Sequence, residues 1–179
     1  MKGCDLQDAM DRMSVPTRVD EALMRRVCGN YATGVAIVST MSATDQPVAL
    51  TVNSFSSVSL DPPLILWSLR STSPSRRHFE EGKAFAISIL GEGQNELAMR
   101  FARAVPDKFD GVTRRPGLLG APLIEGSIAH LECLRYHHLE AGDHIIFIWH
   151  VVEARQAPDR APLTYYEGRF HRIAPLPGA

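Results

Sequence analysis

The chain has 179 residues, of which 45% are hydrophobic and 22% are charged, and its formal net charge is −1 with neutral histidines. This length and composition fit one globular domain with a full hydrophobic core. The small net charge gives no electrostatic reason to expect nucleic acid or an anionic membrane as a partner. Nowhere do 18 apolar residues run together, so we expect no membrane span.

The N-terminal part of the chain begins with an expected flexible leader over residues 1–16. Thr17 is the predicted N-cap of a helix in which apolar residues recur at helical spacing until Gly34 ends it. A buried strand is predicted over 35–40. Turn-forming residues follow it, so the next strand, over 48–53, is expected to return antiparallel.

The next segment is punctuated by prolines. A strand predicted over 55–60 ends at two consecutive prolines, which cannot both lie in a sheet interior. A buried strand follows over 64–69. Ser73 and Pro74 then match the N-cap and first-turn proline of a short helix that ends near residue 81.

The second half of the chain contains six predicted elements. In order they are a buried strand over 84–90, an amphipathic helix over 94–103, a surface connection over 104–122, long strands over 124–139 and 144–156, and a short strand over 163–166. A connection of that length in a compact domain is often functional. The domain is expected to span 17–173, with a C-terminal tail over 174–179. About seven strands with hairpin-length connections, and helices that do not alternate with them, predict a mainly β protein with an antiparallel barrel.

Cysteine usage bears on the compartment. Cys4, Cys28 and Cys133 are too few and too scattered for a disulfide framework, and no CxxC pair is present. This favours a reducing cytoplasm. The polar, acidic N-terminus lacks the apolar core of a signal peptide, so the predicted location is cytoplasmic.

Two polar segments are candidates for ligand binding. The first, residues 51–57, has five hydroxyl or amide side chains in seven positions between apolar strands. Either these side chains meet a polar ligand, or Asn53 and Ser54 cap their own backbone in a turn, which composition alone favours. The second segment, residues 70–77, combines a helix start, hydroxyls and three arginines. It suits a phosphate or, equally on spacing, a capped surface helix with solvated arginines.

Motifs that bind nucleotides in other folds are absent. The chain has no GxGxxG after a strand, no GxxxxGK[ST] and no GxSxG. Any bound nucleotide must therefore be held by another device. Cys133, His137, His138 and His144 cluster in sequence, but strand alternation sends His137 and His138 to opposite faces. Cys133 shares a face only with His137 if the strand is regular, so we expect no metal site.

Six stretches of the chain resemble the flavin reductase-like domain family, which includes the reductase partners of hydroxyphenylacetate and phenol monooxygenases. They are ThrGlyValAlaIleValSerThr (33–40), ThrValAsnSerPheSerSerValSerLeuAspProProLeu (51–64), GlnAsnGluLeuAlaMetArgPheAla (94–102), GlyAlaProLeuIleGluGly (120–126), GlyAspHis (142–144) and LeuThrTyrTyrGluGlyArgPhe (163–170). The resemblance implies an FMN-binding split β-barrel with Greek-key connections and two or three peripheral helices. It also implies a homodimer with flavin near the subunit boundary.

The resemblance also implies a set of flavin contacts, which lie on or beside the strands of these motifs. They are Thr51, Val52, Asn53 and Ser54 along the isoalloxazine ring and ribityl chain, Ser68, Leu69, Arg70, Ser71 and Ser73 near the ribityl and phosphate end, Phe101 and Ala102 closing the pocket, Lys108 at the phosphate, Tyr166 and Phe170 near the flavin or nucleotide, and Thr33 and Ser57 as further cofactor contacts. His144 is the catalytic candidate and would orient the nicotinamide. Its alternative role is a hydrogen bond to the loop backbone.

The function implied is transfer of hydride from NADH or NADPH to FMN or FAD. Reduced flavin would then diffuse to a partner monooxygenase. A different reading is a non-catalytic flavin-binding or redox-sensing split-barrel protein, which needs no nicotinamide site. A third is a pyridoxal-phosphate or haem protein on a related barrel.

Overall fold

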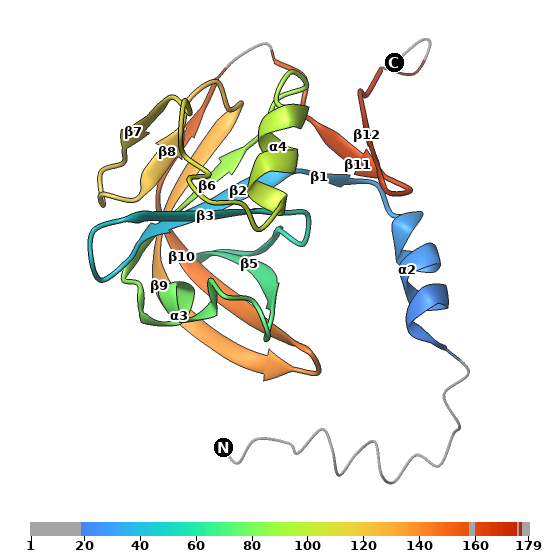
Figure 1. Cartoon of the computed structure of the whole chain (residues 1–179), viewed down its shortest axis with the longest axis horizontal. Coiled ribbons are helices and arrows are strands. Elements are labelled where there is room, and N and C mark those ends of the chain that lie inside the picture. Colours follow the sequence, from blue (N-terminus) through green and yellow to red (C-terminus); the bar gives the residue numbers. More distant parts are fainter. Residues whose placement is uncertain (1–18, 158–159, 175, 177–179) are drawn as a thin grey trace, which may run out of the picture.

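The computed structural model describes residues 19–157, 160–174 and 176 (Figure 1). The predicted leader over residues 1–16 and the predicted N-cap Thr17 lie outside the described residues.

A seven-stranded sheet, ordered β3-β2-β6-β9-β10-β5-β4, forms the body of the molecule, and its strand pairs are antiparallel. Its strands are β2 (Ala36–Met41), β3 (Pro47–Val52), β4 (Ser56–Leu60), β5 (Pro63–Arg70), β6 (Ala84–Ile89), β9 (Ala129–Ala141) and β10 (His144–Gln156). The prediction of a mainly β, antiparallel fold is therefore confirmed. The sequence placed these strands to within a few residues, except that β9 begins later than expected.

Two smaller sheets complete the β structure. One contains β1 (Thr33–Gly34), β11 (Thr164–Tyr166) and β12 (Arg169–His171), and the other contains β7 (Arg114–Pro116) and β8 (Pro122–Ile124). β7 lies inside the segment expected to be a surface connection. The sequence did not predict this strand because Arg-Arg-Pro has no apolar alternation, and the strand is defined by its pairing with β8. The strand expected from residue 124 is interrupted at Gly126, whose φ of +77° suits a turn.

Helix α2 (Glu21–Gly29) begins and ends at different residues from those predicted. Its N-cap is Asp20, whose carboxylate accepts a hydrogen bond from the Leu23 amide at 2.7 Å. The helix ends before Gly34, which instead belongs to β1. The apolar spacing located the helix, but it could not choose between neighbouring cap residues.

Helices α3 (Arg76–Glu81) and α4 (Asn95–Ala102) lie on either side of β3 in the view of Figure 1. α4 matches its prediction closely. The N-cap of α3 is Ser75 rather than the predicted Ser73. Ser73 precedes the helix in a turn, in which its carbonyl accepts from the Arg76 amide at 3.0 Å and its hydroxyl accepts from the Ser75 amide at 3.3 Å. The turn extends to Ser75, and the regular helix begins at Arg76.

The sheet wraps around a core of aliphatic side chains with an aromatic centre. Side chains from six strands enter one cluster: Val38, Val52, Trp67, Ile87, Cys133 and Phe147. At its centre, Trp67 stacks on Phe147 with centroids 4.8 Å apart, and Phe85 stacks on Trp149 at 4.2 Å. A second cluster under α4 includes Phe101. Packing from all sides rigidly positions the strand ends that carry the polar segments.

Candidate functional site

The polar segment that follows Thr51 is anchored to β5 by a side chain. The Ser54 hydroxyl accepts from the Ser68 amide at 3.0 Å and donates to the Ser68 carbonyl at 3.3 Å. The pairing of β4 with β5 begins at Ser56 opposite Leu66, so Ser54 satisfies the next backbone groups along β5 with its side chain. This contact fixes residues 51–54 beside the end of β5.

The end of β5 meets the start of β10. Arg70 pairs with His144, and the Ser71 amide donates to the Asp143 carbonyl at 2.9 Å. The Asp143 carboxylate lies 2.7 Å from His144 Nδ1, and this hydrogen bond lowers the pKa of Asp143. The side-chain partner of His144 is thus a carboxylate and not the loop backbone. Its side chain is 41% exposed, which leaves the ring accessible.

The α4 side of the region is held by two hydrogen bonds to helix carbonyls. The Thr51 hydroxyl donates to the Ala98 carbonyl at 2.7 Å, and Lys108 Nζ donates to the Phe101 carbonyl at 3.1 Å. Partial burial lowers the pKa of Lys108 because it disfavours the charged ammonium. Lys108 therefore both stabilises the C-terminal end of α4 and carries a poorly solvated cation.

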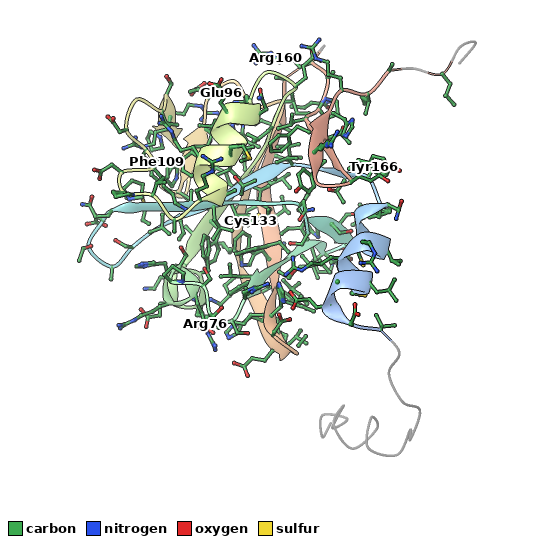
Figure 2. The ribbon with its side chains drawn as sticks, turned by 45° about the vertical axis from the view of Figure 1, so that its right-hand side comes forward. Arg76, Glu96, Phe109, Cys133, Arg160 and Tyr166 are labelled. Atoms are coloured by element: carbon green, nitrogen blue, oxygen red, sulfur yellow. The ribbon has the colours of Figure 1, made fainter. Side chains whose placement is uncertain are left out.

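Thr33, Tyr166 and Phe170 come together in the sheet of β1, β11 and β12. Thr33 pairs with Tyr165, and Tyr165 in turn pairs with Phe170. Thr33 Oγ1 is buried and has no hydrogen-bond partner among the described residues. Figure 2 shows Tyr166 and Phe109 on either side of α4. The hairpin from Thr164 to His171 thus approaches the region from the side opposite the loop around Lys108.

Several residues predicted to contact the flavin have buried side chains, so their backbone groups are the parts available to a ligand. The side chains of Val52, Leu69 and Phe101 are buried in the two core clusters. Ala102 and Asn53 are exposed, as is Ser57, which lies on the edge strand β4 opposite Ile65. Of the polar members, Asn53 and Arg70 project from strand ends with no side-chain hydrogen bond recorded in the described part of the chain.

A cavity of about 1120 Å³ lies beside this region and was missed by residue-level prediction. Its wall combines the start of β3, the residues before α3 and the loop between α4 and β7. The lining residues are Gln46, Pro47, Val48, Ala49, Pro74, Ser75, His78, Val105, Asp107, Lys108, Phe109, Asp110, Gly111, Val112, Thr113 and Arg114. Lys108 is the one predicted contact among them. The length and glycine content of the 104–122 segment were the signal in the sequence.

The histidines of β9 are the candidate metal ligands that the sequence offered. No group of three metal-ligating side chains occurs within the described ranges. The prediction that Cys133 shares a face with His137 held only for a regular strand, and β9 is not regular here, because the register against β10 shifts between Arg135 and His137. The bulge places His138 on the face of Cys133, where its ring lies 5.8 Å from Phe147.

Comparisons with known proteins agree on one family. The family described as "Flavin reductase like domain" matches residues 24–174. The chain is 34% identical over 160 residues to the "Flavin-dependent monooxygenase, reductase subunit HsaB" of Mycobacterium tuberculosis, covering 88% of this chain and 85% of that protein. It is 37% identical over 164 residues to the "FMN reductase (NADH) SmoA" of Agrobacterium fabrum, covering 92% of each.

A solved structure extends the similarity to three dimensions. It is the NADH:FAD oxidoreductase SgcE6 of Streptomyces globisporus C-1027 in complex with NAD and FAD fragments. The TM-score is 0.83 at 40% identity, with 87% of this chain and 94% of that chain covered. No helix within the described residues is long and apolar enough to cross a membrane.

Proposed function

Because this chain belongs to the flavin reductase-like domain family, we propose that it is an NAD(P)H:flavin oxidoreductase that reduces FMN or FAD. The family and the split-barrel fold class predicted from the sequence motifs are confirmed. The observation that carries the proposal is the junction of β3, β5 and β10, where Asn53, Arg70 and His144 lie at neighbouring strand ends.

The donors at this junction fit a ligand with a hydroxylated chain and a phosphate. Ser71 and Ser73 provide hydroxyls in the turn that follows Arg70, and Lys108 provides an ammonium at the adjoining cavity. The buried Thr33 Oγ1, which has no partner among the described residues, requires a polar group that a bound ligand would supply. We propose these residues and the remaining predicted contacts as the flavin site.

A bound flavin would supply the hydride acceptor, with a nicotinamide nucleotide as donor. The protein's own task is to hold the two rings together and exclude water. The contact of His144 Nδ1 with the Asp143 carboxylate favours a proton on Nδ1, which leaves Nε2 of the neutral ring as an acceptor. In that state His144 can accept a hydrogen bond from a carboxamide N–H and so orient the nicotinamide.

We also propose that the protein acts as a homodimer in the cytoplasm and supplies reduced flavin to a monooxygenase component. Support for a second copy comes from α2, none of whose residues is buried. Met24, Val27 and Tyr31 are 55%, 60% and 78% exposed, an apolar face that a partner subunit would cover. HsaB, named as a reductase subunit, supports the monooxygenase partner. The domain bounds 17–173 are likewise proposed.

Steady-state oxidation of NADH and NADPH against FMN, FAD and riboflavin tests the activity. We expect turnover with at least one flavin, and NADH as the better donor. No turnover with any flavin, together with tight flavin binding, would support the non-catalytic flavin-binding module instead. A red-brown purified protein would identify the haem alternative.

Two variants test the assigned residues. His144→Ala is expected to raise the KM for NADH while flavin affinity stays nearly unchanged, and Asn53→Ala is expected to weaken flavin binding with little loss of fold. The matched control is His137→Ala, an exposed histidine on the hairpin partner of β10. Equal losses of NADH and flavin affinity in His144→Ala would mean that His144 is structural.

A further inference from the structure

A second, smaller pocket lies at the end of β10 away from His144. It has a volume of about 470 Å³ and lies between the β7–β8 hairpin and the chain after β10. It shares no lining residue with the large cavity near Lys108. Figure 2 shows Arg160, one of its lining residues, at the opposite end of the molecule from Arg76 of α3. The pocket is therefore separate from the proposed flavin site.

The wall of this pocket is held in place by hydrogen bonds between β8 and the main sheet. The Ile124 amide donates to the Ser88 hydroxyl at 3.1 Å, and His130 Nε2 lies 2.9 Å from the Ile124 carbonyl. Both bonds join the end of β8 to strands β6 and β9. Arg155 pairs with His130 across the β9–β10 ladder and so lines the pocket from a rigid strand position.

The residues that line the pocket carry a net positive charge. Among the described residues that line it, Arg115, Arg155 and Arg160 face a single carboxylate, that of Glu125, which leaves a net charge of +2 with the histidine neutral. Glu125 lies 3.2 Å from Arg115, and Arg155 has only a long contact of 3.5 Å with Glu153. Arg160 donates to a backbone carbonyl at 2.8 Å. Guanidinium groups have five N–H donors each, so these contacts leave donors for a ligand.

A buried hydroxyl provides an independent sign of a ligand. Ser127 lines the pocket and is only 4% exposed, and its Oγ has no hydrogen-bond partner within the described part of the chain. Buried hydroxyls are almost always hydrogen-bonded. With its hydroxyl turned toward the pocket, Ser127 would donate to an acceptor oxygen that the arginines also bind.

We propose that this pocket binds a phosphate group, either free or as a phosphate monoester. Three guanidinium groups and a hydroxyl, contributed by separate segments, suit a tetrahedral dianion with three equivalent oxygens. A carboxylate has two oxygens in one plane, which a single guanidinium can pair with fully. A phosphate here would connect the β7–β8 hairpin to the end of β10.

Calorimetric titration of the full chain tests the proposal with inorganic phosphate and with AMP. The chain is first saturated with FAD, which occupies the flavin site without supplying a phosphate monoester. We expect one saturable site per chain, with Arg155→Gln weakening binding by about tenfold or more. Ser127→Ala should weaken it several-fold. The control Arg25→Gln removes the same charge from an exposed pair with Glu21 and should leave phosphate affinity unchanged.

Tighter binding of AMP than of phosphate would identify a nucleotide monoester as the ligand, and equal affinities would identify the phosphoryl group itself. Both results support the site. Absence of saturable binding of either probe would overturn the proposal, as would equal weakening by Arg155→Gln and Arg25→Gln. Because Arg155 is 58% exposed, its substitution should leave the fold intact, and unchanged melting of the ligand-free variant checks this.

Discussion

The substitution Ser54→Ala tests whether the polar segment beside β5 is held in place by one hydroxyl. Ser54 makes two hydrogen bonds to the backbone of Ser68, at 3.0 Å and 3.3 Å, in a partly buried position. The shorter bond has the usual N–H···O length and the longer one is weak. A net contribution of about 1 kcal/mol for the first and less for the second predicts a loss of about 1–2 kcal/mol on removing both.

That loss should appear as a fall in melting temperature of roughly 2–8 °C for a chain of this size. Urea unfolding followed by tryptophan fluorescence measures the free energy, since Trp67 and Trp149 are fully buried in the core. Flavin affinity should fall as well, because Asn53 is positioned by its neighbour. The control is Ser59→Ala, which removes a hydroxyl from the nearby edge strand β4 where no side-chain hydrogen bond is formed among the described residues.

Equal unfolding free energies for Ser54→Ala and Ser59→Ala would refute the stabilising role of the Ser54 bonds. The expected loss of stability in Ser54→Ala together with unchanged flavin affinity would instead refute the claim that Ser54 positions Asn53 for flavin binding. It would show that flavin binding does not depend on the attachment of residues 51–54 to β5.

Three further predictions concern titratable groups. Lys108→Met should weaken FMN binding by about tenfold but leave riboflavin, which has no phosphate, nearly unaffected in a fluorescence titration. Because the bond to His144 lowers the folded pKa of Asp143, its contribution to stability is present above the unfolded value of about 3.9 and is lost as pH falls through the lower folded value. In urea unfolding, the free energy of unfolding of wild type should exceed that of Asp143→Asn at pH 6, roughly two units above the unfolded pKa, and the difference should shrink toward pH 3, roughly one unit below it. A difference that does not change with pH would contradict this reasoning. Burial raises the pKa of Cys133 to about 12, so in protein whose N-terminal cysteine is replaced by serine, a thiol reagent should modify exposed Cys28 quickly and Cys133 only after unfolding.

Strand pattern and motif chemistry were readable in the sequence because they depend on neighbours in the chain. The buried strands around Ile37, Trp67 and Ile87 were placed almost to the residue, and the motif beginning at Thr51 identified the family. Cap residues were less predictable. The N-caps are Asp20 and Ser75 rather than the predicted Thr17 and Ser73. Several polar residues near a helix start are suited to the N-cap position, and the local backbone turn decides which of them occupies it.

The amino-acid sequence by itself determined that this is an antiparallel β protein of the flavin reductase-like family, since alternation, turns and a long motif are local properties. Tertiary structure alone decided that a bulge places His138 rather than His137 on the face of Cys133, and that Arg155 and Ser127 line one pocket. These contacts join residues through strand register and packing. A shift of one position in register changes every face and partner, and a bulge such as the one in β9 breaks the alternation from which a face is predicted.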